Sequence, residues 1–500
     1  MQEKLARLKQ LWQEIHDLRV GVALMEWDQQ VNMPHGGAED RSDAVSTLSS
    51  VIHEKQTSEE LVRLNEELAP YGEQLDPNSD DACLIRVSNR IISKKSRVPA
   101  EFIKEFTRLT ALSQNVWEKA KADNNFAIFR PYLEQIVEMK KQYAALFKPY
   151  DHVYDPLLDD FEPGLKTADV KAIFDELRPQ QVDLIHRISE KPQVRDDFLH
   201  VAYPESGQWD FGVDAVTHCG YDWNRGRQDK AVHPFTISFG IDDVRITTKF
   251  IPKMPSSALF STIHEGGHAM YEQGVSKNLR RLPLATEISM SLHESQSRMW
   301  ENVVGRSHAF WEYFYPRMKK LFPTQLDGVD LETFYRGINK VEPSFIRTES
   351  DEATYNLHIM LRLELEIALM EGKLAVKDLP AAWNERMKGY LGVQPPTDSL
   401  GVLQDVHWSS GYIGYFPTYA LGNLVSAQWW EIVQKEIPDI EKQFSQGKFD
   451  QLLDWLRKNI HVHGGKFEAQ KLVQEVTGSK ISPQPYMRYL TEKFERIYNL

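Results

Sequence analysis

The chain is dominated by segments whose apolar residues recur every three or four positions, the spacing of one face of a helix. The first such segment lies near the N-terminus and carries Leu5, Leu8, Leu11, Trp12, Ile15 and Leu18. We expect this helix to run past Trp27 and to end before Pro34, because proline interrupts helical hydrogen bonding. Further helical patterns continue to Leu68, from Asp80 to Lys95 and from Phe129 to Phe147. The expected fold class is therefore mainly α.

One region departs from the helical spacing. Between Val232 and Phe250, apolar and polar residues alternate on either side of a turn at residues 240–243, which predicts a β-hairpin. The second strand would place Asp243, Arg245 and Thr247 on one face. That face is either solvated or part of an edge that positions a peptide substrate by strand addition.

Composition narrows the class of protein. The 500 residues are 41% hydrophobic and 26% charged, which is typical of a globular protein, and no Gly/Ser-rich linker divides them. Length alone would allow about three domains. Because no boundary is visible, we expect a single folded unit over residues 1–500.

Charge and apolar runs argue against several partners. A net charge of −13 opposes nucleic acid or an anionic membrane as the main partner. No run approaches the roughly 18 to 20 apolar residues of a membrane helix, and the charged N-terminal segment does not resemble a signal peptide. Cys83 and Cys219 are too few for a disulfide framework, and we expect both to be buried thiols. These features predict a cytoplasmic protein.

The sequence His264-Glu265-Gly266-Gly267-His268 is an H-E-x-x-H motif inside a predicted helix over residues 255–274. Residues four apart share a helix face, so both imidazoles can reach one cation, while Glu265 can reach a water molecule that the cation activates. The two glycines each cost about 1 kcal/mol in a helix relative to alanine, which indicates close approach of another backbone or a ligand. The motif therefore predicts zinc-assisted hydrolysis.

A catalytic zinc usually takes three protein ligands, so a third must follow downstream. Gly274 stands where the metzincin pattern needs a histidine, which excludes that class. Three acids recur every seven residues on one face of the next predicted helix: Glu287, Glu294 and Glu301. We expect Glu294 to be the ligand, because 26 residues after His268 leave enough chain to return antiparallel. His293 is the rival, but neighbouring helix positions differ by about 100° and only one of the two can face the metal.

Six motifs in order resemble the carboxypeptidase Taq family of metallocarboxypeptidases. They are HPF at 233–235, DVRIT at 243–247, HEGGH at 264–268, HESQ at 293–296, IRTESD at 346–351 and GVLQDVHW at 401–408. WDQQVNMP at 27–34 and DPLLDDFEPG at 155–164 also look similar to the family. Ser350 stands where the family often has alanine, a change between small residues.

The resemblance implies a helical ellipsoid with a deep groove, akin to neurolysin and angiotensin-converting enzyme, with the N-terminal helices as one wall. It implies removal of C-terminal residues from peptides with a free C-terminus. One Zn²⁺ per chain, replaceable by cobalt, and a homodimer are also implied. Glu265 would serve first as general base and then as general acid.

An exopeptidase of this kind must recognise a free carboxylate, which the planar fork of arginine binds well. Arg347 is the candidate and Arg245 the runner-up, although the local sequence around Arg347 also fits an ion-paired arginine. The resemblance assigns His407 and Tyr419 to transition-state stabilisation and Tyr415 to the substrate pocket. An isolated histidine or tyrosine here would more often be a packed core residue.

The sequence leaves two alternatives open. An oligopeptide endopeptidase of the same fold would use the same metal site, and its cuts would be internal. A non-enzymatic helical scaffold would carry H-E-x-x-H by accident and would bind no catalytic zinc. For the carboxylates that orient the histidines, Asp243, Asp351 and Asp405 are candidates among which the sequence does not choose.

Overall fold

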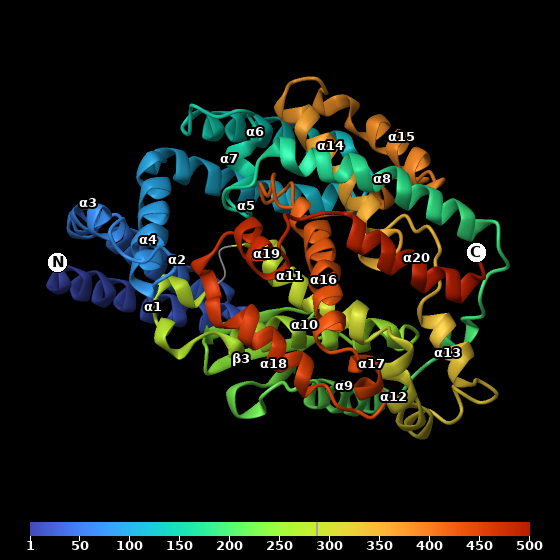
Figure 1. The fold of residues 1–500 in the computed structure, drawn as a ribbon. Helices are drawn as coiled ribbons and strands as arrows, with labels where there is room; N and C mark the ends of the chain where they lie inside the picture. The colour runs from blue at the N-terminus through green and yellow to red at the C-terminus, as the bar shows by residue number, and fades with distance from the viewer. Residues whose placement is uncertain (287–288) are drawn as a thin grey trace. The chain divides into compact units, whose positions relative to one another are not determined.

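The computed structural model of the protein describes residues 1–286 and 289–500. Its contacts divide the chain into two compact units. The first comprises residues 1–96, 195–338 and 429–478, and the second comprises residues 97–194, 339–428 and 479–500. Both units are mainly helical, which confirms the expected fold class (Figure 1).

The first unit carries most of the helices and the only sheet found in the described residues. Its helices are α1 Gln2–Val31, α2 Ala38–Gln56, α3 Glu59–Gly72, α4 Asp80–Arg97, α9 Glu205–Cys219, α10 Pro255–Gly274, α11 Met290–Arg298, α12 His308–Leu321, α13 Leu331–Ile338, α17 Ile440–Phe444, α18 Asp450–Asn459 and α19 Ala469–Thr477. A π-helical turn, Met299–Val304, continues α11 directly.

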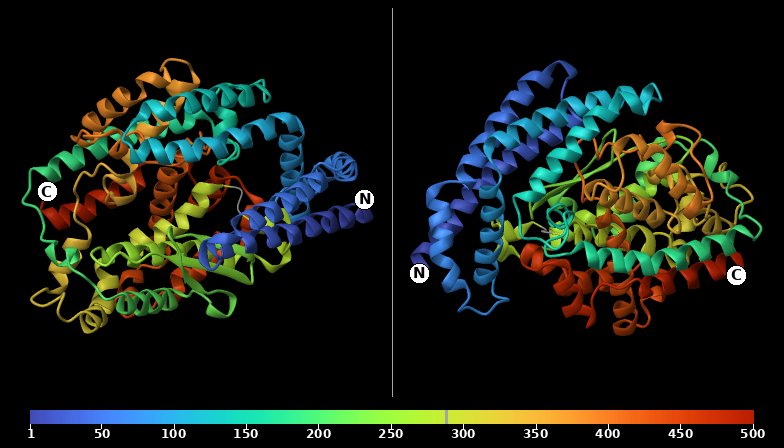
Figure 2. Two further views of the ribbon diagram at one scale, coloured as in Figure 1. Left: turned by 180° about the vertical axis from the view of Figure 1, so that it is seen from behind. Right: turned by 90° about the horizontal axis from the view of Figure 1, so that it is seen from above.

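The predicted N-terminal helix is confirmed as α1. Its buried residues are Trp27 and four of those that defined the apolar face, Leu5, Leu8, Trp12 and Ile15. The indole nitrogen of Trp12 donates a hydrogen bond to Ser88 Oγ on α4, at 2.9 Å. α1 and α2 lie side by side (Figure 2).

The sheet has the strand order β1–β3–β2, with bounds Gln228–Lys230, Thr236–Gly240 and Asp243–Thr248. β2 and β3 form the predicted antiparallel hairpin, with Ile237 opposite Arg245. β1 pairs parallel to β3 and was not expected, because its three polar residues show no alternation. Val244 and Ile246 are fully buried, and β3 packs against α10.

The second unit contains α5 Ala100–Ala122, α6 Phe126–Ala145, α7 Asp155–Leu158, α8 Thr167–Ser189, α14 Tyr355–Met370, α15 Leu379–Leu391 and α20 Gln484–Tyr498. α16, Pro417–Glu436, begins in this unit and ends in the first. α14 is its core, since 14 of its 16 residues are buried. Among the described residues, no helix combines the length and the apolar character needed to cross a bilayer.

Candidate functional site

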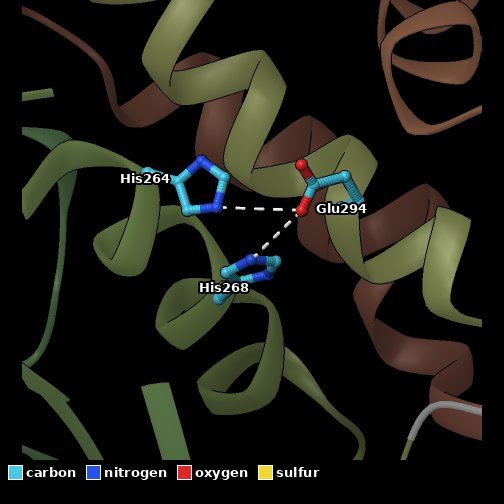
Figure 3. A group of neighbouring side chains, drawn as sticks. All are labelled: His264, His268 and Glu294. Atoms are coloured by element: carbon cyan, nitrogen blue, oxygen red, sulfur yellow. Dashed lines mark ion pairs between the residues drawn. The ribbon is translucent and has the colours of Figure 1, made fainter. Parts of the chain in front are cut away.

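Three side chains of the first unit converge at the middle of α10. His264 and His268 lie one turn apart on this helix, and Glu294 reaches them from α11. The Nε2 atoms of His264 and His268 lie 3.7 and 3.5 Å from Glu294 Oε2 (Figure 3). All three ligand atoms lie within 4.8 Å of one another, so the group could hold one metal ion.

This donor set fits a catalytic divalent cation. Ligand atoms about 2.0–2.1 Å from a tetrahedral ion lie about 3.3–3.4 Å apart, close to the two nitrogen–oxygen distances. Two imidazoles and one carboxylate are typical ligands of a catalytic zinc, which leaves one coordination position for the reacting groups. The residues present therefore fit the metal that the motif predicts.

The second glycine of the motif, Gly267, allows α10 and α11 to approach closely. A Cβ atom on Gly267 would lie 2.8 Å from both the carbonyl oxygen of Gln296 and Cα of Ser297, which belong to the backbone of α11. A Cβ atom on Gly266 would meet Cγ1 of Val216 at 3.0 Å. The close approach of another backbone is confirmed at Gly267, where it brings Glu294 within reach of the histidines, whereas Gly266 faces a side chain of α9.

His264 is oriented by Glu301, which lies in the π-helical turn after α11. Glu301 Oε2 is 2.8 Å from Nδ1 of His264. Burial alone would raise the pKa of Glu301, but Arg298 and His264 outweigh it and hold the pKa at about 2. The ionised carboxylate therefore accepts the Nδ1 hydrogen, and Nε2 of His264 keeps its lone pair for a metal.

His268 is oriented by a longer chain of hydrogen bonds. Its Nδ1 lies 2.5 Å from Nδ1 of His293, and Nε2 of His293 lies 3.0 Å from Glu272 Oε1. Only one hydrogen fits between the two Nδ1 atoms. Glu272 accepts the hydrogen from His293 Nε2, so His293 Nδ1 is the acceptor and His268 Nδ1 the donor. Nε2 of His268 is therefore also left with a lone pair.

Glu294 is ionised in this arrangement. Burial opposes the charge, yet Arg298 and His264 hold the pKa of Glu294 well below its usual range. Arg298 donates to Glu294 Oε1 at 2.7 Å, and Oε2 is the atom that faces the two imidazoles. His293 lies on the opposite side of His268, behind its Nδ1.

Glu265 follows His264 on α10 and is held by the sheet. The Thr236 hydroxyl on β2 donates to Glu265 Oε2 at 2.7 Å. Burial raises the pKa of Glu265, although His264 and Thr236 oppose the shift. A carboxylate in such surroundings is a better proton acceptor than one in water.

Arg245 lies on β3 in the same unit. Its Nε and Nη2 atoms donate to the two oxygens of Asp243, at 2.9 and 2.8 Å. Its guanidinium lies 4.5 Å from the ring centroid of Trp27 and 4.6 Å from that of Phe239. The fork of Arg245 is therefore already occupied by a carboxylate of its own strand.

The second unit gathers the other predicted residues. Arg347 is only 6% exposed, and its Nε and Nη2 both donate to Asp405 Oδ1, at 3.1 and 3.0 Å. Its Nη1 donates to the Tyr355 hydroxyl at 3.0 Å. The guanidinium lies 5.0 Å from the ring centroid of Tyr419.

His407 belongs to the same cluster. Its Nε2 lies 3.3 Å from the Tyr419 hydroxyl, and its ring centroid lies 5.5 Å from that of Tyr415. The centroids of Tyr415 and Tyr419 are 5.1 Å apart. Burial lowers the pKa of His407 to about 4, so its imidazole is neutral at physiological pH. The structure thus brings Arg347, His407, Tyr415 and Tyr419 together.

A family model described as carboxypeptidase Taq (M32) metallopeptidase matches residues 7–494. The chain belongs to this family. Among its carboxypeptidase Taq relatives, thermostable carboxypeptidase 1 of Thermus thermophilus is 39% identical over 486 residues, 95% of each chain. Carboxypeptidase 1 of Bacillus subtilis is 36% identical over 480 residues, 96% of this chain and 95% of that one. The crystal structure of the M32 carboxypeptidase from Deinococcus radiodurans superposes with a TM-score of 0.97 over the whole of both chains, at 38% identity.

Membership of the carboxypeptidase Taq family confirms the resemblance seen in the motifs. The protein is a metallocarboxypeptidase that uses a divalent metal, and peptides are its substrate class. The comparisons support this activity and not the endopeptidase alternative. The non-enzymatic scaffold likewise finds no support in a family of metallopeptidases.

The carboxylates expected to orient the histidines have other partners, which corrects that expectation. Asp243 binds Arg245, Asp405 binds Arg347, and Asp351 accepts backbone N–H groups of residues 342, 353 and 354. The carboxylates that do act on the histidines are Glu301 and, through His293, Glu272.

The spacing of acidic residues in the sequence partly indicates the roles of Glu301 and Glu272. Glu301 stands seven residues after Glu294, two turns along the same face, and Glu272 stands one turn after His268. Glu287, the third acid of the sevenfold series, lies outside the described residues.

Proposed function

We propose that the protein is a zinc-dependent carboxypeptidase that removes residues one at a time from the free C-terminus of peptides. One zinc ion per chain would be held by His264, His268 and Glu294. The observation that carries this proposal is the convergence of Nε2 of His264 and Nε2 of His268 on one carboxylate oxygen of Glu294, at 3.7 and 3.5 Å. Cobalt, which accepts similar nitrogen and oxygen ligands, is the expected substitute.

The wider organisation of the enzyme is part of the proposal. The two units would act as one catalytic unit over residues 1–500, and two such chains would form a homodimer, as the resemblance implies. A cytoplasmic location is supported by the two cysteines, Cys83 and Cys219, which are both buried and unpaired.

Glu265 is assigned the proton transfers of hydrolysis. A divalent cation bound at this centre supplies Lewis acidity, which lowers the pKa of water and polarises a carbonyl. Glu265 takes the proton from the attacking water and then delivers it to the leaving amine, so one residue is base and then acid. The Thr236 hydroxyl fixes Oε2 of Glu265, and we assign the transfers to Oε1.

The cluster of the second unit is assigned to the substrate. Arg347 would bind the C-terminal carboxylate, His407 and Tyr419 would stabilise the transition state, and Tyr415 would line the substrate pocket. Arg245 is the weaker candidate for the carboxylate, because Asp243 already occupies both branches of its fork.

The experiment that tests the proposal measures the metal content and then follows digestion of an N-blocked peptide by mass spectrometry. Stepwise C-terminal loss that stops with a chelator and returns with zinc is the expected result. The same peptide with a C-terminal amide should be a poor substrate. Internal cuts, or equal cleavage of acid and amide, would contradict a carboxypeptidase.

A matched variant separates chemistry from metal binding. Glu265→Gln keeps the size of the side chain but cannot accept the proton. It should retain zinc at the stoichiometry of the wild type while turnover is lost, and retained turnover would refute the role of Glu265.

A further inference from the structure

A second arginine lies behind Arg347 in the second unit. Arg362, on α14, is completely buried, and its Nε and Nη2 donate to Asp405 Oδ2 at 2.7 and 2.5 Å. Its Nη1 donates to the carbonyl oxygen of His358 at 2.6 Å. Asp405 therefore binds two guanidinium groups, Arg347 through Oδ1 and Arg362 through Oδ2.

The three groups do not cancel. Arg362 and Arg347 hold the pKa of Asp405 well below its usual range although burial alone would raise it, so the carboxylate is ionised. Two guanidinium groups and one carboxylate leave a net charge of +1. The histidines that interact with them electrostatically, His407 and His358, both have pKa values lowered by burial and are neutral.

Glu366, the other carboxyl group that interacts electrostatically with Arg362, is hydrogen-bonded to other donors. Glu366 accepts hydrogen bonds from the Tyr154 hydroxyl, the Trp408 indole and the Gly414 amide, at 2.6, 2.7 and 3.0 Å. Burial raises its pKa to about 7, which reduces the negative charge it can offer to Arg362. The hydrogen bonds of Glu366 go to these three groups and not to Arg347 or Arg362, so Glu366 does not form an ion pair that neutralises the surplus positive charge.

An arginine that is fully paired with one carboxylate has little net attraction for a second carboxylate. With Asp405 alone, Arg347 would form a neutral pair, and a substrate carboxylate would meet almost equal attraction and repulsion. Arg362 supplies the missing charge from the other side of Asp405. Among the contacts of the described residues, Asp405 and Tyr355 take three of the five N–H groups of Arg347, which leaves two for a further acceptor.

We propose that Arg362 is a specificity-determining residue of this carboxypeptidase: it offsets the charge of Asp405, so that Arg347 retains one net positive charge for the C-terminal carboxylate of the peptide. Arg362 acts through Asp405 and Arg347 and is a positioning residue. The proposal rests on the function proposed above for Arg347.

Charge-changing variants distinguish this role from that of a structural clamp. Arg362→Met brings the net charge of the three positions to zero, and KM for peptides with a free C-terminus should rise by about tenfold or more, while kcat changes little. Adding Asp405→Asn restores the net charge to +1. The asparagine Oδ1 can still accept from Arg347, so KM should return toward the wild-type value. A structural clamp predicts that the double variant binds no better than Arg362→Met.

A matched control exists on the same helix. Glu364 on α14 lies between Arg178 and Arg386, at 2.6 and 3.1 Å, so it is also a carboxylate shared by two arginines. Arg386→Met should leave KM unchanged. Arg362→Lys keeps the charge but not the fork, and it should keep KM within a few-fold of the wild type. This variant provides the test if Arg362→Met folds poorly. Thermal unfolding monitors folding in every variant.

The outcomes separate failure of this proposal from failure of the proposed function. If Arg347→Met retains the preference for peptide acids over amides, the proposed role of Arg347 is wrong, and the role of Arg362 falls with it. If Arg347→Met loses the preference but folded Arg362→Met keeps the wild-type KM, only the Arg362 proposal is overturned. Failure of Asp405→Asn to restore KM in the Arg362→Met background overturns it as well.

Discussion

Glu301 Oε2 lies 2.8 Å from His264 Nδ1, on the side of the imidazole away from Glu294. Glu294 and Glu301 therefore act on opposite nitrogens of one histidine. They lie two turns apart on one continuous helical segment, the first in α11 and the second in the π-helical turn after it. The segment supplies both a ligand and the group that orients another ligand.

Glu301→Gln should weaken metal binding without removing the site. Glutamine can still accept the Nδ1 hydrogen, but it lacks the charge that increases the basicity of the imidazole. The dissociation constant of zinc, measured by competition with a chelator, should rise by about 10- to 100-fold. Glu312→Gln is the matched control, since Glu312 pairs with His308 at 3.2 Å on α12. An unchanged zinc affinity in Glu301→Gln would contradict the orienting role.

His293→Phe tests the hydrogen-bond chain behind His268. Phenylalanine can preserve the ring stacking seen between His268 and His293 but cannot accept the Nδ1 hydrogen. We expect one zinc per chain, because all three ligand atoms remain. The affinity for zinc should fall by about tenfold or more, because His268 loses the acceptor that orients it. Complete loss of zinc, with Glu294→Ala retaining it, would instead make His293 the ligand.

Local sequence patterns predicted the features of the fold and of the site that depend only on residues close together in the sequence. The helix face of Leu5, Leu8 and Trp12 and the pairing of His264 with His268 follow from helical spacing alone, and the β2–β3 hairpin follows from alternation. The angle between adjacent helix positions likewise predicted that only one of Glu294 and His293 could face the metal.

Contacts between segments far apart in the sequence could not be predicted from local spacing. The orienting role of Glu301 depends on how α11 crosses α10, and that crossing is set by Gly267 against the backbone at Gln296. Arg362 was missed because its partner, Asp405, is 43 residues away and the segment around Arg362 reads as a buried helix. The grouping of the chain into two units from three separate stretches each is likewise invisible to local periodicity.

Gly267→Ala should damage the metal centre more than Gly266→Ala. The new Cβ atom at position 267 would meet two backbone atoms of α11 at 2.8 Å, and backbone cannot move without displacing Glu294. At position 266 the nearest atom is a side-chain carbon of Val216 at 3.0 Å. We expect overpacking at Gly267 to cost about 1–3 kcal/mol of the free energy of unfolding, together with weaker zinc binding.

The Gly266→Ala variant serves as the control. There the better helix propensity of alanine, about 1 kcal/mol, offsets the smaller strain. Equal zinc affinities and equal melting temperatures for the two alanine variants would show that the approach of the α11 backbone does not limit the site.

Burial raises the pKa of Glu366 from its ordinary value of 4.5 to about 7, although donors from Tyr154, Trp408 and Gly414 oppose the shift. Between these two pH values the folded protein keeps a proton that the unfolded chain has lost. The unfolded state binds fewer protons, so the free energy of unfolding falls as pH rises through this window, by up to about 3 kcal/mol. Below pH 4.5 both states are protonated and the contribution is complete.

Glu366→Gln cannot titrate, and its cost in hydrogen bonding is the same at every pH. The stability of the wild type relative to Glu366→Gln, measured by urea unfolding at pH 5, 6, 7 and 8, should therefore decrease steadily from pH 5 to about pH 7. Above that pH it should become level, because the carboxyl group is then ionised in both the folded and the unfolded state. A difference that stays level from pH 5 to pH 7 would show that this buried carboxyl group titrates at its ordinary value.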